Sequence, residues 1–562
     1  MVYRIADNVL SPLGMTTAEN FQALRSGKSA LSCHSSYSGR KEDDYVASKF
    51  SEIQRHQLMV MGLTWFESLV YQSVKNALRD CSVDIASKRT LLIVSTTKAN
   101  IEYLLFDNYD ELQPAESATR VAEKLGITTK PLIVCNACIS GVAAIITAQR
   151  LINTDFYDTV IVVGCDVISH FVVSGFQSLK AMSPEPCMPF DIERIGLNLG
   201  EAAATLILSN KNPHEDSWQI VNGAIRNDAY HISSPSPKGE GCFNAIRYVL
   251  EGINPHNLSA VNVHGTATMY NDQMESKAIE SSGLSDVPSN TLKGYYGHTL
   301  GASGILETII TLHSVECGEL LGTRGFKEIG VSGQINISAN SVCISKESFV
   351  KVISGFGGCN AAIYCQRGKT KDNPVSQFDY HIEHSVRITP SGIIVDGCQM
   401  SLETGEKDIL IELYKKIIGS YPKFYKMDKL SQLGFVASEL LLSQETHRKK
   451  QCSDRAVILF NHSSSVWVDR EYEHSIDSKE DYFPSPSLFV YTLPNIVCGE
   501  IALRNGYHAE TSFYILNNKD ESIMKSVLVS AFCDKSLESI VTGWIDYKDE
   551  LNYEADFKII KK

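Results

Sequence analysis

The stretch Pro131–Ile146 reads Pro-Leu-Ile-Val-Cys-Asn-Ala-Cys-Ile-Ser-Gly-Val-Ala-Ala-Ile-Ile. Its apolar run Leu132–Cys135 predicts a buried strand, and the small residues after Cys138 predict a helix that another backbone can approach closely. Asn136 and Ala137 form the sharp turn between strand and helix. We therefore expect Cys138 on a strand-to-helix elbow, where the helix dipole favours the reactive thiolate. On this stretch alone, a small buried structural cysteine is an equally good interpretation.

The composition is that of a globular protein long enough for several domains. The chain has 562 residues, of which 43% are apolar and 21% charged. A net charge of −13 argues against a nucleic-acid binder and against adhesion to an anionic membrane. No apolar run approaches the ~18 residues of a membrane span, and the N-terminus lacks a signal pattern. The pair Cys135 and Cys138 has no matching second pair, so neither a metal site nor a disulfide framework is indicated, and we expect a cytoplasmic protein.

Strands and helices alternate over most of the chain, which predicts α/β layers with buried strands. We expect a first half at residues 1–215 and a second half at 216–367, separated by the polar break Lys211–Ser217. Residues 368–377 are rich in Lys, Asp, Asn and Pro and are predicted to be a linker. Residues 378–562 form the remaining third.

Three further stretches carry side chains suited to chemistry. His264 ends a predicted strand and begins His-Gly-Thr-Ala-Thr; alone it is better explained as a core histidine. His298 precedes a helix built from small residues, in Lys-Gly-Tyr-Tyr-Gly-His-Thr-Leu-Gly-Ala-Ser-Gly from Lys293. Gly355–Ala361 reads Gly-Phe-Gly-Gly-Cys-Asn-Ala, which also suits a plain hairpin turn.

Together with Pro-Phe-Asp-x-x-Arg-x-Gly-x-x-x-Gly-Glu from Pro189, these motifs resemble the β-ketoacyl-acyl-carrier-protein synthases, condensing enzymes of the thiolase-like fold. The resemblance covers roughly Met1–Arg367, and five motifs in the family's order are highly specific. It implies two βαβαβ-type halves in an α/β/α/β/α arrangement. The remaining third is expected to be a diverged thiolase-like half.

The resemblance also implies roles for single residues. Cys138 accepts an acyl group from a phosphopantetheine arm, and the backbone N–H groups of Cys138 and Phe356 form the oxyanion hole, with Phe356 as gate. His264 and His298, as neutral Nε2–H donors, promote decarboxylation of malonyl-acyl carrier protein. The supporting residues are expected to be Lys293 and Glu275, linked directly or through water, with Thr266, Thr268, Asp272 and Gly357 binding substrate. No cofactor is implied, since phosphopantetheine arrives on acyl carrier protein.

Two other functions stay open. A thiolase-type transferase using coenzyme A would carry a second acid/base cysteine near the glycine-rich turn, where Cys359 lies, although the synthase pattern assigns that position no chemistry. A non-catalytic partner of the chain-length-factor type would have lost the nucleophile, which Cys138 argues against. The partners expected for a synthase are acyl-ACP, malonyl-ACP and a second copy of the chain.

Residues 378–562 read as a truncated repeat of the first half. Phe424–Leu442 corresponds to the helix Met59–Leu78, Ala456–Asn461 to the strand Leu91–Ser95, and Val541–Asp546 to Val162–Asp166. Ser487–Leu493 is predicted to be the strand before the elbow, which places Ile496 or Val497 at the nucleophile position, with Cys498 out of register. This part is therefore expected to be inactive and to shape the acyl tunnel or the carrier entrance.

The exposed edge of the strand Leu132–Cys135 predicts a homodimer joined through that strand, with the C-terminal third docked on it or on its own symmetry mate. A fused accessory half is unusual in housekeeping fatty-acid synthesis. It suggests a dedicated type II pathway, such as aryl polyene or other polyketide biosynthesis.

Overall fold

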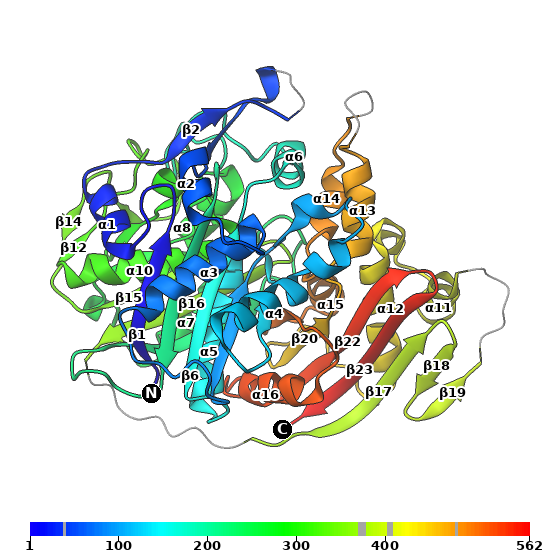
Figure 1. The fold of residues 1–562 in the computed structure, drawn as a ribbon. Helices are drawn as coiled ribbons and strands as arrows, with labels where there is room; N and C mark the ends of the chain where they lie inside the picture. The colour runs from blue at the N-terminus through cyan, green and yellow to red at the C-terminus, as the bar shows by residue number, and fades with distance from the viewer. Residues whose placement is uncertain (38–40, 369–377, 402–407, 478–481) are drawn as a thin grey trace.

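The computed structural model describes residues 1–37, 41–368, 378–401, 408–477 and 482–562. Helices cover mixed β-sheets in layers, and the C-terminal part, yellow to red in Figure 1, lies beside the blue and cyan strands of the first half. The predicted linker 368–377 lies outside the described residues, apart from Gly368. Within the described ranges, no helix combines the length and the apolar character needed to cross a membrane.

The first half is a five-stranded sheet in the order β5-β4-β6-β8-β1, with β4 parallel to both β5 and β6. Its outer face is covered by α3 and α4. The elements are β1 (Tyr3–Leu10), α3 (Trp65–Leu78), β4 (Thr90–Ser95), α4 (Pro114–Leu125), β5 (Leu132–Val134), α5 (Ser140–Asn153), β6 (Thr159–Asp166) and β8 (Ala202–Ser209). The buried strands confirm the pattern that the apolar runs predicted.

The second half repeats this plan. Its sheet runs β11-β10-β15-β16-β9, and α7 and α8 cover its outer side. The elements are β9 (Trp218–Asn227), α7 (Glu240–Val249), β10 (Ala260–Asn262), α8 (Met269–Ser281), β11 (Pro288–Asn290), α10 (Ser303–Glu316), β15 (Ser348–Gly355) and β16 (Cys359–Arg367). The helices α5 and α10 contact each other and strands of both sheets, so they form the central layer of the predicted arrangement.

Close packing in this central layer depends on glycine. A Cβ on Gly141 would lie 3.0 Å from the Gly301 carbonyl oxygen, and one on Gly304 would lie 2.7 Å from the Val142 nitrogen. The small residues at the start of each helix therefore allow α5 and α10 to meet nearly backbone to backbone. The two motifs that carry Cys138 and His298 lie at these N-termini, so this contact brings them together.

The C-terminal part contains a complete counterpart of the first half. Its main sheet runs β21-β20-β22-β23-β17, the same order as β5-β4-β6-β8-β1. The elements are β17 (His381–Thr389), α12 (Lys429–Leu442), β20 (Arg455–Asn461), α13 (Val466–His474), α14 (Pro486–Tyr491), α15 (Ile496–Asn505), β21 (Thr511–Ile515), α16 (Glu521–Ala531), β22 (Ser539–Asp549) and β23 (Asn552–Lys561). A hairpin of β18 (Gly392–Val395) and β19 (Cys398–Met400) extends β17.

Hydrogen bonds support the correspondence. Asp166 at the end of β6 accepts bonds from the Thr96 hydroxyl and the Thr97 nitrogen after β4. Asp546 in β22 likewise accepts bonds from the nitrogen and hydroxyl of Ser463 after β20. The predicted matches of α12, β20 and β22 with the first half are therefore confirmed.

The predicted position of the second elbow is wrong. Ser487–Leu493 lies largely in the helix α14, and Ile496, Val497 and Cys498 lie in α15. The strand equivalent to β5 is β21, and the helix equivalent to α5 is α16. Strand pairing relative to the two aspartates makes Tyr514 the counterpart of Val134. Four residues beyond Val134 is Cys138, and four residues beyond Tyr514 is Asn518, so the thiol is absent there.

The edge of β5 is occupied within the chain. β21 pairs antiparallel with β5, with Tyr514 opposite Val134 and Ile515 opposite Ile133, which joins the two sheets into one. The side-chain amide of Asn136 strengthens the junction, donating to the Thr511 carbonyl and accepting from the Phe513 nitrogen, each at 3.0 Å. The predicted pairing of two copies through Leu132–Cys135 is therefore wrong, because a second copy would have to displace β21, and the homodimer itself stays a prediction.

Candidate active site

Cys138 lies where the sequence predicted, on a turn between β5 and α5. Ala137 has a φ of +47°, which few non-glycine residues adopt, and begins the short 3₁₀ turn Ala137–Ile139. The Ser140 hydroxyl fixes this turn by donating to the Ala137 carbonyl at 2.6 Å and accepting from the Asn136 nitrogen at 2.8 Å. This strained turn changes the direction of the chain sharply, so that the Cys138 side chain faces a cavity.

The protonation of Cys138 differs from the expectation. Burial raises the pKa of the Cys138 thiol to about 11, although Lys293 and the backbone N–H groups of Cys138 and Phe356 act in the opposite direction. The resting thiol is therefore protonated at neutral pH. The same two N–H groups are those expected for the oxyanion hole. The glycine before Phe356 makes their approach possible, since a Cβ on Gly355 would lie 3.1 Å from the Cys138 nitrogen.

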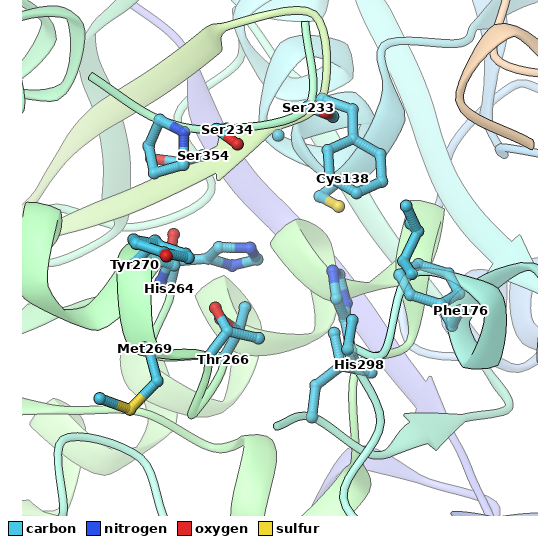
Figure 2. A pocket seen from close by; sticks show the side chains of 18 of the residues that line it. Cys138, Phe176, Ser233, Ser234, His264, Thr266, Met269, Tyr270, His298 and Ser354 are labelled. Atoms are coloured by element: carbon cyan, nitrogen blue, oxygen red, sulfur yellow. The ribbon is translucent and has the colours of Figure 1, made fainter. Parts of the chain in front are cut away.

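Two histidines from the second half face Cys138. The rings of His264 and His298 meet edge to face with centroids 5.1 Å apart, and their donor atoms and the Cys138 sulfur lie within 4.8 Å of one another. Figure 2 shows the three side chains pointing into one space. Burial and the nearby Lys293 lower the pKa of both imidazoles well below the usual value, so both are neutral.

The tautomer of His298 follows from one hydrogen bond. Its Nδ1 accepts a bond from the Leu300 nitrogen at 3.2 Å, which places the proton on Nε2. Among the described residues, this buried Nε2 has no hydrogen-bond partner. A buried N–H donor without a partner is unfavourable unless a ligand accepts a hydrogen bond from it. This is the group expected to bind a thioester carbonyl.

The cavity in front of Cys138 has a volume of about 390 Å³. Both histidines line it together with Thr266 and Thr268, whose hydroxyl groups lie 2.9 Å apart. Met269 and Tyr270 stand near its mouth and are largely exposed (Figure 2). The predicted substrate-binding threonines are therefore brought together with the three catalytic candidates.

Lys293 takes its partner from a residue that sequence reasoning missed. Its ammonium lies 2.5 Å from Glu307, and the other oxygen of Glu307 lies 2.5 Å from Lys351. Although burial opposes the shift, the two lysines lower the pKa of Glu307 to about 2. Glu307 within the apolar middle of the helix α10 and Lys351 within the apolar strand β15 are the available signal, since such charges are rarely buried unpaired.

Three other predicted residues lie outside the cavity lining. Glu275 does not contact Lys293; it accepts bonds from the nitrogens of His264, at 2.5 Å, and Gly265, at 2.8 Å, and so orients the loop after β10. Asp272 is buried beneath that loop and accepts from the Phe190 nitrogen at 2.8 Å. Gly357, with a φ of +90°, faces the C-terminal part. These residues position the site and are not placed to touch substrate.

Phe356, the expected gate, lines both the cavity and a second, inner pocket. Its ring stacks on Phe176, and its carbonyl accepts a hydrogen bond from Asn495 of the C-terminal part at 2.9 Å. Both Phe356 and Cys138 line the inner pocket, which is completed by Phe489 and Leu493 of the C-terminal part. Residues 378–562 therefore reach the site.

Cys359 is placed unlike an acid/base group. Its thiol contacts the Phe356 carbonyl oxygen at 3.1 Å and the Asn136 carbonyl oxygen at 3.8 Å, and it is absent from the cavity lining. Burial raises its pKa well above the ordinary value. A thiol held in this way is a structural residue of the glycine-rich turn.

Comparison with known proteins agrees with this geometry. The family models "Beta-ketoacyl synthase, N-terminal domain" and "Beta-ketoacyl synthase, C-terminal domain" match residues 5–214 and 219–327. A Schizosaccharomyces pombe protein named putative 3-oxoacyl-[acyl-carrier-protein] synthase, mitochondrial, is 27% identical over 63% of this chain and 96% of its own. The Staphylococcus aureus 3-oxoacyl-[acyl-carrier-protein] synthase 2 is 28% identical over 45% of this chain and 65% of its own.

A solved structure extends the likeness to the C-terminal part. "PfaC Keto synthase-Chain length factor" covers 100% of this chain and 78% of its own, with a TM-score of 0.77 and 13% identity, which shows a shared fold. Because the two family models together match more than half of the chain, with the paired motifs assembled in one cavity, this protein belongs to the β-ketoacyl synthases, condensing enzymes of the acyltransferase class.

Proposed function

We propose that the chain condenses an acyl group held on Cys138 with malonyl-acyl carrier protein, releasing carbon dioxide and giving a β-ketoacyl-acyl carrier protein. The observation that carries this proposal is the unpartnered Nε2–H of His298 beside His264 and the Cys138 thiol. A single cavity thus offers a nucleophile and neutral donors for a carbonyl that becomes an enolate.

In the first step, the Cys138 sulfur attacks the thioester of an acyl carrier protein. A carbon–sulfur bond forms to Cys138, the bond to the pantetheine sulfur breaks, and that sulfur leaves with the thiol proton. Negative charge develops on the carbonyl oxygen, where the N–H groups of Cys138 and Phe356 stabilise it. One such donor is typically worth about 3 kcal/mol.

In the second step, malonyl-acyl carrier protein binds and loses its carboxylate as carbon dioxide. The electron pair passes to the thioester, whose oxygen accepts hydrogen bonds from His264 and His298. The resulting carbanion attacks the acyl-Cys138 carbonyl, a carbon–carbon bond forms, and the Cys138 sulfur leaves. Decarboxylation drives the bond, so we propose that neither a metal nor a nucleotide takes part and that phosphopantetheine arrives on the carrier.

A Cys138→Gln variant separates the two steps. The glutamine amide imitates the acyl-enzyme carbonyl, so the variant should release carbon dioxide from malonyl-acyl carrier protein without condensation. Adding His298→Ala should reduce that release by about 10²-fold or more, whereas adding Cys498→Ala should leave it unchanged. A folded Cys138→Gln protein that releases no carbon dioxide would contradict the assignment.

The pathway is proposed more coarsely. The C-terminal part shares its fold with a ketosynthase–chain length factor structure, which favours a dedicated type II pathway of the polyketide or aryl polyene kind over housekeeping fatty-acid synthesis. Incubation with a panel of acyl carrier proteins and mass analysis of the products tests this. Activity confined to a fatty-acid carrier protein would count against it.

A further inference from the structure

The inner pocket behind Cys138 is small. Its volume is about 20 Å³, room for about one water-sized group. Apolar side chains from both parts of the chain form most of the wall, including Phe489 and Leu493. Among the residues that line the pocket, Lys98 is the one that carries a charge. A buried ammonium in an otherwise apolar acyl pocket requires an explanation.

The ammonium of Lys98 is held by the C-terminal part. It lies 2.7 Å from Asp469 on α13, 3.5 Å from the Ser465 hydroxyl, and it also donates to the Thr492 carbonyl. The Phe171 ring lies against it at 5.2 Å. An ammonium has three N–H donors, and these three partners account for all of them. Lys98 therefore has no donor left with which to bind the end of a substrate.

An apolar acyl chain cannot displace this group. Lys98 and Asp469 are both almost fully buried, and separating them would leave two unpaired charges in an apolar surrounding. Removing the partner of a buried charge is strongly destabilising, whereas burying one more methylene is only weakly favourable. Growth of the chain toward Lys98 therefore becomes unfavourable once the apolar space is filled.

We propose that the ion pair of Lys98 and Asp469 forms the closed end of the acyl pocket and limits the length of the acyl chain that Cys138 can carry. This inference rests on the proposed function, because it assumes acylation of Cys138. The length limit is then set jointly, by a cation from the first half and a carboxylate from the C-terminal part.

The test measures acylation of Cys138 by a series of methyl-ended acyl carrier proteins from two to twelve carbons. Intact mass is followed with time, and each rate is divided by the same variant's two-carbon rate. In Lys98→Ala/Asp469→Ala, the eight-carbon ratio should rise at least tenfold over the wild type. Should that protein fail to fold, Lys98→Met/Asp469→Leu keeps the core filled without charge and should raise the ratio about threefold.

Arg150→Met/Glu510→Leu is the matched control. That ion pair is equally buried and also joins the two parts, but it does not line the pocket, so the ratio should stay at the wild-type value. A wild-type length profile in a folded Lys98/Asp469 variant would overturn the inference. So would a wild-type preference for acyl chains ending in a carboxylate, which would make Lys98 a recognition group. Wild-type protein that accepts no acyl group would instead contradict the proposed function.

Discussion

The first half and the C-terminal part share one strand order but differ on the inner face of the sheet. On β8, Leu206 is completely buried beneath α10. The equivalent position on β23, read from the pairing of β8 with β6 and of β23 with β22, is Lys558, which is half-buried. The same backbone thus presents an apolar residue where this face is fully buried and a charged residue where it is partly exposed.

Ion pairs complete this polar face. Arg387 on β17 lies 2.9 Å from Glu554 on β23, and Lys519 lies 2.8 Å from Asp556. An antiparallel sheet tolerates water on one face when its outward residues are polar. The C-terminal part thus presents a charged, partly exposed face where the first half has a buried apolar one. It keeps the face that contacts the catalytic halves and has lost the nucleophile.

The largest expected effect is that of removing the C-terminal part. Ending the chain at Gln377 would expose the edge of β5 and leave three buried cations, Lys98, Arg150 and Arg226, without Asp469, Glu510 and Asp534. Without the C-terminal part these cations and the apolar side chains around them would meet water, and an uncovered strand edge favours aggregation. Light scattering and circular dichroism should show aggregated or unfolded protein. A well-folded monomer of residues 1–377 would show that the first two halves do not need the C-terminal part to fold.

Replacing the elbow residue should abolish activity in the first half and should have little effect in the C-terminal part. Cys138→Ala is expected to lower condensation by about 10⁴-fold or more, measured by product formation from acyl- and malonyl-acyl carrier proteins. Asn518→Ala, at the equivalent elbow of the C-terminal part, and Cys498→Ala should each stay within twofold of the wild type. Substantial loss in either control, with normal folding, would mean that the C-terminal part takes part in the chemistry.

Cys138 and Cys498 should also differ in their reactivity toward alkylating reagents. Because burial raises the pKa of Cys138 to about 11, its thiolate fraction should increase about tenfold per pH unit from pH 7 to 10. Iodoacetamide labelling of Cys138, followed by peptide mass spectrometry, should increase in the same way. Cys498 is fully buried and should remain unlabelled in the folded protein. A labelling rate that is flat above pH 7 would indicate a resting thiolate instead.

The smallest effects concern the inner faces of the two sheets. Leu206→Lys places a charge beneath α10 and should lower the free energy of unfolding by at least about 3 kcal/mol. Lys558→Leu should change it by no more than about 0.5 kcal/mol, because that face meets water. Urea unfolding measures both. Equal losses would mean that the face of β23 is covered in solution.

Much of the catalytic site could be predicted from sequence because its motifs are local. The elbow at Cys138 and the loops of His264 and His298 each depend on a strand end, a turn and a helix start that lie together in the chain. Which carboxylate meets Lys293 depends on how α10 packs between the sheets, and no local motif shows this. The motifs therefore point to Glu275 as the partner of Lys293, whereas Glu307 makes the contact. The expectation of a resting thiolate counted the helix dipole and omitted burial.

The sequence predicts the second elbow at the wrong place because the apolar run Ser487–Leu493 suits a strand as well as a buried helix. Ser485 and Pro486 before it form an N-cap and a first helical turn, which was the available signal for α14. The actual strand β21 carries no cysteine motif to mark it. Its pairing with β5, a contact between residues nearly 400 positions apart, decides the assembly and leaves no local pattern.

We infer that one chain carries one catalytic cysteine, Cys138, in a site completed by its own C-terminal part. Intact mass and peptide mapping of full-length protein, after reaction with excess short-chain acyl carrier protein, test this most directly. We predict one acyl group per chain, attached to Cys138. A second acyl group, or one attached to Cys498 or another cysteine of residues 378–562, would show that Cys138 is not the one nucleophile of the chain.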